Sequence, residues 1–194
     1  MPRARVWYLV LLAVGLPAVA GAQSRFALAA RGGWSGFTGS DLASAGSALL
    51  LDLSLRYGRR HGLSGSAGGH FSNHTEADSI ELDAVGAYVE ARYTGPTLSA
   101  NAAPFATVRG GYTRHGFTTT SGAATQEGSQ DGWTIGGTVG AALELAERVD
   151  IEIAGMYTLV RLGDATINGN PRPGSHRSGG QWALLVGVAF RPGG

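Results

Sequence analysis

The feature that most constrains the fold of this chain is a strict alternation of residue types near its C-terminal end. Trp182, Leu184, Val186, Val188 and Phe190 occupy every second position, and the residues between them are mostly small or polar. Because successive side chains of a β-strand point to opposite faces, this run predicts a strand with one large apolar face. Such a stripe needs an apolar medium beside it and is typical of a membrane β-strand.

The same alternation recurs along the rest of the chain. No helical periodicity persists after Gln23, and the abundant glycines, 32 of 194 residues, are dispersed through the alternating runs instead of forming a linker. The sequence therefore predicts an all-β fold with an even number of strands. The eight expected strands are Phe26–Phe37, Ser47–Tyr57, Leu63–Ser72, Asp83–Tyr93, Phe105–Phe117, Trp133–Leu145, Val149–Arg161 and Gln181–Arg191.

The N-terminal region has the composition of a secretory signal peptide. Arg3 and Arg5 supply a positive start, residues 6–20 are apolar, and Ala20-Gly21-Ala22 is a small-residue cleavage motif. We expect cleavage after Ala22, so that residues 1–22 are the signal peptide and residues 23–194 form one domain. The charges of that domain are nearly balanced and it has no cysteine. No nucleic-acid partner is indicated, and no disulfide stabilises the exported protein.

The lengths of the expected connections are a second, independent signal. Every odd-numbered connection is long and polar, whereas the even-numbered ones are mostly short. The long ones are Thr38–Gly46, Asn73–Leu82, Thr118–Asp131 and Leu162–Gly180. Long extracellular loops that alternate with short periplasmic turns are typical of outer-membrane barrels, and aromatic residues gather toward the strand ends as in their girdles. This parity places both termini in the periplasm.

On these features the chain resembles the small eight-stranded outer-membrane β-barrel proteins of Gram-negative-type bacteria. The resemblance covers Gln23–Arg191, and the last strand looks like the C-terminal assembly signal of that family, although four residues follow Phe190 here. It implies an eight-stranded antiparallel up-and-down transmembrane β-barrel in the cell outer membrane. The partners it implies are outer-membrane lipid, lipopolysaccharide and the barrel assembly machinery. We expect a monomer without cofactor or metal.

Charged residues recur on the polar faces of the expected strands. Eight strands enclose an interior that side chains just fill, so we expect no diffusion pore. Buried charges persist only when they are paired and hydrogen-bonded. We therefore predict a structural salt-bridge network in the lumen, built from Arg31, Asp52, Arg56, Glu90, Arg92, Arg109, Glu144 and Glu152.

A second hypothesis rests on the segment His70-Phe71-Ser72-Asn73, which resembles the His-x-Ser-Asn stretch of outer-membrane lipid A deacylases. These enzymes are also eight-stranded barrels, and the resemblance assigns the base to His70 and the nucleophile to Ser72. Residues two apart on a strand share a face, and a carboxylate from Glu81 or Asp83 could orient the histidine. Alternation directs both side chains to the lumen, however, so the leading interpretation is not an enzyme.

A third hypothesis is a soluble periplasmic barrel that binds a ligand in its cavity, since periodicity alone does not tell the inner face from the outer. Such a barrel would place Leu and Val inside. The loop parity, the aromatic girdles and the final Phe190 favour the membrane instead. The leading interpretation is a non-enzymatic outer-membrane barrel with a filled lumen, which acts in envelope structure or in binding through its extracellular loops.

Overall fold

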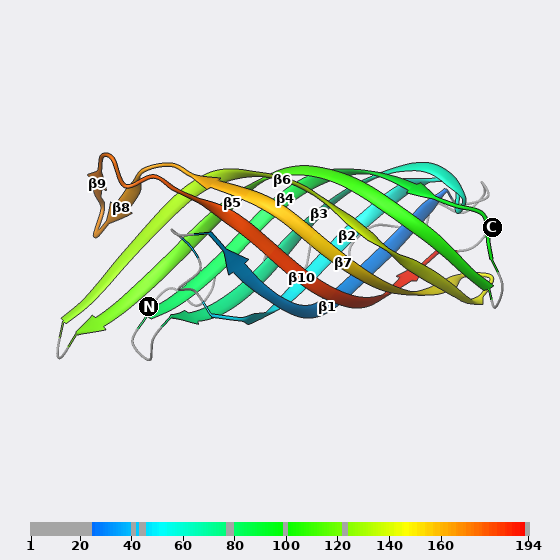
Figure 1. Cartoon of the computed structure of the whole chain (residues 1–194), viewed down its shortest axis with the longest axis horizontal. Helices are drawn as coiled ribbons and strands as arrows, with labels where there is room; N and C mark the ends of the chain where they lie inside the picture. Colours follow the sequence, from blue (N-terminus) through cyan, green and yellow to red (C-terminus); the bar gives the residue numbers. More distant parts are fainter. Residues whose placement is uncertain are drawn as a thin grey trace.

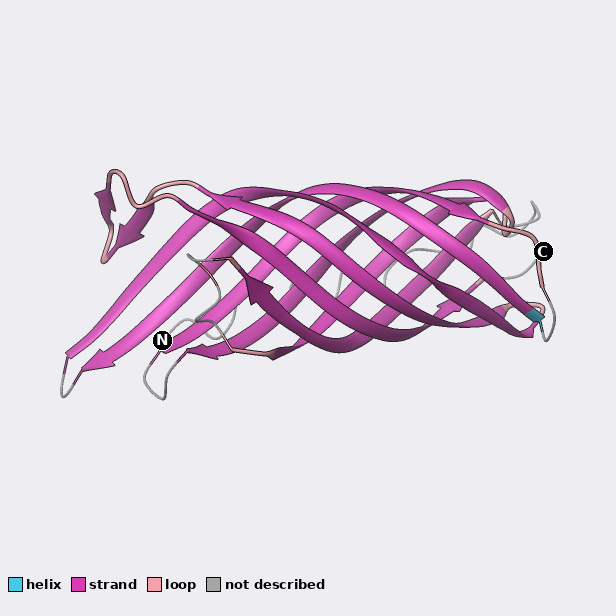
Figure 2. Cartoon of the chain, in the orientation of Figure 1, coloured by secondary structure: helices cyan, strands magenta, loops and turns pink. Residues whose placement is uncertain are grey.

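The computed structural model describes residues 25–39, 42, 46–76, 80–98, 101–121 and 124–192, nearly all of them in strands (Figure 2). The expected signal peptide lies outside the described residues. The strands are β1 (Phe26–Thr38), β2 (Ala48–Gly58), β3 (Gly62–Glu76), β4 (Ile80–Thr94), β5 (Ala102–Ser121), β6 (Ala124–Ala146), β7 (Val149–Leu162), β8 (Ala165–Ile167), β9 (Asn170–Arg172) and β10 (Arg177–Phe190). Within this part of the chain, no helix is long and apolar enough to cross a membrane.

Eight of these strands close into a ring. Each pairs with its neighbour in the order β1-β2-β3-β4-β5-β6-β7-β10, and β10 returns to β1 in an antiparallel register that joins Leu28 to Phe190 and Trp34 to Leu184. The strands are strongly tilted to the long axis of the barrel (Figure 1). The small hairpin β8–β9 lies outside the ring and pairs with β6. The predicted eight-stranded antiparallel β-barrel is therefore confirmed.

The two ends of the barrel differ. One end, the turn end, carries the start of β1, the end of β10 and the connections β2–β3, β4–β5 and β6–β7 (Figure 1). The other, the loop end, carries the tips of β5 and β6 and the hairpin β8–β9. We use these two names below.

The large apolar side chains face outward. Along β2, Leu49, Leu51 and Leu53 are 62%, 57% and 48% exposed, whereas the intervening Leu50 and Asp52 are fully buried. The same holds around the ring, so aliphatic and aromatic groups form its outer surface and most charges lie inside. This is the reverse of a soluble barrel with an apolar cavity, and that hypothesis is wrong because so large an apolar outer surface needs lipid around it.

The lumen is filled by side chains, including two apolar clusters. One cluster centres on Leu50, Phe105, Met156 and Leu185. The second closes the loop end, where Phe37 and Leu42 meet buried residues at the ends of β4 and β7. These two clusters pack the interior in the way a protein core is packed.

The strands at the loop end are longer than the sequence predicted. The expected loop 73–82 is mostly strand, because β3 runs to Glu76 and β4 starts at Ile80. The expected loop 118–131 is the tip of the β5–β6 hairpin, and the expected loop 162–180 contains β8 and β9. These segments are mostly polar, so the apolar alternation that revealed the other strands stops before the strands do.

Candidate functional site

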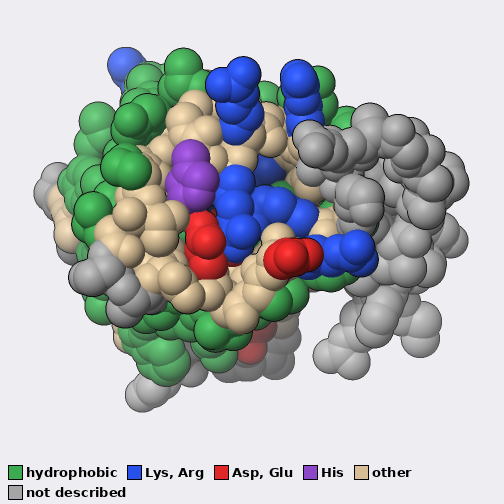
Figure 3. Space-filling view, turned by 90° about the vertical axis from the view of Figure 1, so that its right-hand side faces the viewer, with side chains coloured by type: hydrophobic (Ala, Val, Ile, Leu, Met, Phe, Trp, Pro, Cys, Tyr) green, Lys and Arg blue, Asp and Glu red, His purple; other side chains and the backbone are tan. Residues whose placement is uncertain are grey.

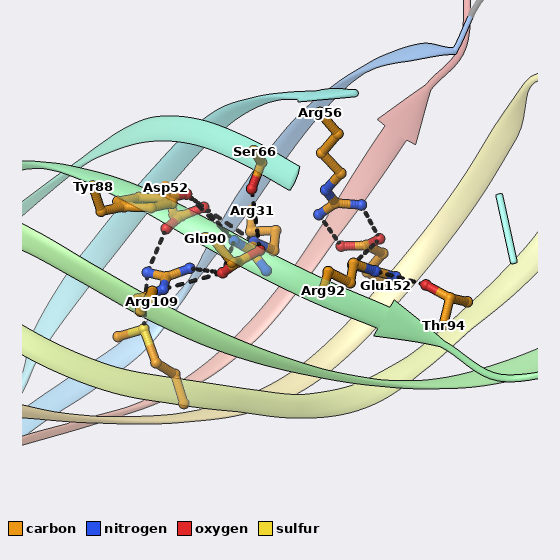
Figure 4. Close-up of polar contacts among 11 residues, drawn as sticks. Arg31, Asp52, Arg56, Ser66, Tyr88, Glu90, Arg92, Thr94, Arg109 and Glu152 are labelled. Carbon is orange, nitrogen blue, oxygen red and sulfur yellow. Dashed lines mark hydrogen bonds and ion pairs between the residues drawn. The ribbon is translucent and has the colours of Figure 1, made fainter. Parts of the chain in front are cut away.

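The centre of the lumen holds a hydrogen-bonded ionic group, which we call the central cluster: Arg31, Asp52, Tyr88, Glu90 and Arg109 (Figure 4). The guanidinium of Arg31 donates to Oδ1 of Asp52 at 2.7 Å, and the Tyr88 hydroxyl donates to the same oxygen at 2.8 Å. Arg109 bridges the two acids, with Nη1 3.1 Å from Asp52 and Nη2 2.8 Å from Glu90.

The sheet register explains why these groups meet. Arg31 lies directly opposite Asp52 on β1 and β2, and Glu90 lies opposite Arg109 on β4 and β5. The two cross-strand pairs then join across the interior, where the ring of Tyr88 stacks under the Arg109 guanidinium at 4.0 Å. The cluster is almost completely buried and its two positive and two negative charges balance. A closed, neutral arrangement is the form in which buried ions are least costly.

A second ionic group, the lower cluster, lies nearer the turn end. Glu152 on β7 accepts two hydrogen bonds from Arg56 on β2 in a bidentate ion pair, and it also lies 2.9 Å from Nη1 of Arg92 on β4. Arg92 further donates to Thr94 at 2.9 Å and stacks over the ring of Phe105 at 3.6 Å. All three charged groups are at least nine-tenths buried. Two guanidinium groups therefore share a single carboxylate.

A third group, the mouth cluster, lies at the turn end. Arg60, from the β2–β3 connection, pairs with Glu144 at 3.3 Å and with Asp150, and Asp150 also pairs with Arg191. Of the eight charged residues expected in the lumen, seven belong to the central and lower clusters. Glu144 does not, because it lies at this mouth with its side chain 21% exposed. It contacts Arg60 and His61 instead of a lumen cation.

Sequence reasoning missed four members of these clusters. Tyr88 and Asp150 shared a face with residues that were expected inside, so the alternation could have revealed them. Arg60 lies outside the strands and Arg191 follows β10, and no periodicity marks such positions. Arg191, the first residue after the final aromatic residue, has a structural role. Its backbone N–H donates to the backbone carbonyl of Arg148, and its side chain donates to Asp150.

The catalytic constellation of the deacylase hypothesis is not assembled. The ring of His70 stacks on Tyr88 at 6.3 Å, while the Ser72 hydroxyl is bonded at 3.0 Å to Nε2 of a different histidine, His74. Nδ1 of His74 contacts the backbone carbonyl of Gly46, not a carboxylate. Glu81 is exposed, and the next residue, Leu82, is buried in the lumen. Because neighbouring residues of a strand point to opposite faces, Glu81 lies on the outer face of the barrel, whereas Ser72 lies on the inner face.

Asp83, the other proposed triad member, does not complete a triad either, and two histidines pack against an aromatic ring. Asp83 is on the outer face and accepts a hydrogen bond from Asn73. His74 and His115 pack against Phe37 at the loop end of the lumen, with ring centroids 4.6 and 5.6 Å away. Within the described ranges, no group of three His, Asp or Glu side chains could hold a metal ion.

The residues of the final strand that resemble an assembly signal all face outward. Leu184, Val186, Val188 and Phe190 are 64%, 57%, 47% and 43% exposed, and Trp182 lies on the same face against Gly36. The inner face of this strand carries small or buried groups such as Ala183 and Ala189. An apolar row of this kind is open to lipid or to a recognising protein.

A closed ring with an apolar outer surface and charged groups inside defines an integral membrane β-barrel. The chain belongs to the family of the outer membrane protein beta-barrel domain, whose model matches residues 7–191. The protein is therefore an outer-membrane protein. In such barrels the short connections are periplasmic and the long ones extracellular, so we expect the turn end to face the periplasm.

Solved structures share this fold at low sequence identity. Neisserial surface protein A matches with a TM-score of 0.66 and 17% identity over 89% of this chain and 100% of that one. OprG from Pseudomonas aeruginosa matches with a TM-score of 0.58 and 15% identity, over 90% of this chain and 99% of that one. A major outer membrane protein from Thermus thermophilus matches with a TM-score of 0.52 and 14% identity, over 86% of this chain and 99% of that one. No curated protein sequence matches the chain. At these identities the likeness concerns the fold alone.

Proposed function

We propose that this protein is a non-enzymatic, closed outer-membrane barrel that acts by binding at the cell surface. The observation that carries the proposal is the contrast between its two regions. The lumen is blocked by buried ion pairs and apolar side chains. The loop end, in contrast, offers an open groove with charged, polar and aromatic residues in its lining, built on long strands.

The block in the lumen argues against a diffusion channel. The central cluster joins β1, β2, β4 and β5 across the interior, and Nη1 of Arg109 also contacts the sulfur of Met156 on β7 at 3.3 Å. Toward the loop end, the cluster of Phe37 and Leu42 adds an apolar layer. Opening a path would require breaking several buried ion pairs at once, which is costly in a low-dielectric interior.

The groove at the loop end supports a binding role. Its volume is about 580 Å³, within the range of roughly 300–1,000 Å³ that is usual for small-molecule sites. Strands β4, β5, β6 and β8 form it, and its lining includes Glu81, Asp83, Arg114, Phe117 and Asn168. Both charge signs and an aromatic ring suit a polar ligand that donates and accepts hydrogen bonds. Most of these groups lie on strands, and Asn168 lies in the turn between β8 and β9.

The lipid-facing surface supports the proposed partners. Outward aliphatic and aromatic groups fit outer-membrane lipid and lipopolysaccharide, and the outward row from Trp182 to Phe190 fits recognition by the barrel assembly machinery. We propose that the protein acts as a monomer, because closure of β10 on β1 leaves no open sheet edge in the ring.

Two measurements test this function. In planar bilayers the purified protein should give no large, steady conductance steps, and such steps would refute the blocked lumen. In nanodiscs it should bind polar ligands on glycan or peptide arrays. Deletion of residues 165–172, which removes β8 and β9, should abolish that binding. Arg59→Ala at the opposite end is the control and should retain it; equal binding by both variants would contradict the groove as the site.

A further inference from the structure

The ionic groups of the barrel are not all balanced in charge. The central cluster has two arginines and two acids, and the mouth cluster likewise pairs Arg60 and Arg191 with two acids. The lower cluster has Arg56 and Arg92 on the single carboxylate of Glu152. Within the described part of the chain, one buried guanidinium charge is thus uncompensated. Burying an unpaired charge is strongly unfavourable, so a counter-anion is expected there.

A small cavity lies beside this excess charge. It has a volume of about 20 Å³, which is room for about one or two water-sized atoms, and it opens at the turn end. Its lining includes Arg56 and Arg92 and all four members of the mouth cluster, whose two carboxylates are already paired with Arg60 and Arg191. Arg25 and Arg59 also line it, and they form no ion pair within the described part of the chain. Figure 3 shows arginine side chains gathered at the centre of this end, next to acidic groups and a histidine.

Hydrogen-bond donors in the same place lack acceptors. Among the described residues, Nε of Arg56 is buried without a partner, and Nη1 of Arg92, although near Glu152, makes no aligned hydrogen bond. Nη1 of Arg31 also has no acceptor among these residues, but it belongs to a cluster whose charges balance. Buried polar groups are nearly always hydrogen-bonded. Only at the lower cluster do missing acceptors, excess positive charge and a cavity coincide.

We propose that this cavity binds a carboxylate that enters from the periplasmic side. The planar guanidinium fork matches a carboxylate with two parallel hydrogen bonds, which gives stronger and more directional binding than a spherical ion. Two oxygen atoms also suit the size of the cavity better than the four of a phosphate. Arg25 and Arg59 at the opening attract the anion. The carboxylate belongs either to a small free acid or to the end of a longer molecule.

The test is anion-dependent stability of the whole barrel refolded into lipid vesicles. At constant ionic strength, acetate should raise the urea midpoint of the wild type, because a ligand that binds only the folded state stabilises it. Arg92→Met leaves Arg56 and Glu152 as a neutral pair, so the acetate-dependent shift should be lost. Arg109→Met, in the central cluster, is the matched control: its midpoint should fall while the acetate-dependent shift persists.

A second measurement does not depend on those variants folding. The ¹³C resonance of labelled acetate should broaden when the wild-type barrel is added. The double substitution Arg25→Gln and Arg59→Gln, which replaces both exposed arginines, should reduce the broadening. A peptide with a free C-terminal carboxylate, compared with its amide, separates the two sources of the anion. No acetate effect on the wild type, a full effect on Arg92→Met, or a larger shift with chloride or phosphate would overturn the proposal.

Discussion

Asp52 is the group on which the central cluster most depends. It is fully buried and receives Arg31 at 2.7 Å, Tyr88 at 2.8 Å and Arg109 at 3.1 Å. In the Asp52→Asn variant the side chain keeps its shape but loses its charge, and its amide NH₂ faces donors. Arg31 and Arg109 would then share only Glu90, so one buried positive charge would be left without compensation.

The expected cost follows from this imbalance. Removal of one partner from a buried ion pair costs about 3–5 kcal/mol, because the remaining charge stays out of water. A suitable control is Asp131→Asn, which removes an acid from the exposed pair with Arg114. The nitrogen and oxygen of that pair are 3.7 Å apart, and the side chains of Arg114 and Asp131 are 61% and 47% exposed. Exposed pairs contribute about 0–1 kcal/mol.

The assay is equilibrium unfolding by urea or guanidinium chloride in lipid vesicles, followed by tryptophan fluorescence. Trp34 and Trp133 are about half exposed on the outer surface and report the loss of lipid contact. We expect a clear drop in the free energy of unfolding for Asp52→Asn and almost none for Asp131→Asn. Equal, small effects of the two changes would refute the view that the lumen charges hold the barrel together.

Three further changes test other parts of the reasoning. Gly33→Ala should cost about 1–3 kcal/mol in the same assay, because its Cβ would overlap the backbone carbonyl of Leu184, whereas Gly155→Ala has open space; equal stability of the two would contradict the close approach of β1 and β10. Val139→Arg, at an outward position that is 66% exposed, should cost about 2–4 kcal/mol in vesicles if that position lies near the bilayer midplane, and an unchanged midpoint would argue against lipid there. Ser72→Ala should leave lipid A acylation unchanged by mass spectrometry, and loss of an acyl chain with the wild type alone would revive the deacylase hypothesis.

The sequence predicted the strand centres well because their signal is local. Leu49, Leu51 and Leu53 alternate with Leu50 and Asp52, and a period of two needs no knowledge of neighbours. The ends of β5 and β6 were not predictable, since their polar tips lack an apolar face. Pairing with each other, and at Gly128 and Ser129 with β8, extends these tips as strands.

For the ionic network, the alternation selected most of the charged residues on the inner faces but named none of their partners. Arg31 and Asp52 meet because the register of β1 and β2 places them opposite each other. Arg56 and Glu152, 96 positions apart, meet across the lumen. That encounter depends on the tilt and stagger of a closed barrel, which are properties of the whole ring. The sequence by itself thus determined a β-barrel with charges on the inner faces of its strands. The closed structure decided which of these charges pair and where one remains unbalanced, because both depend on the geometry of the whole ring.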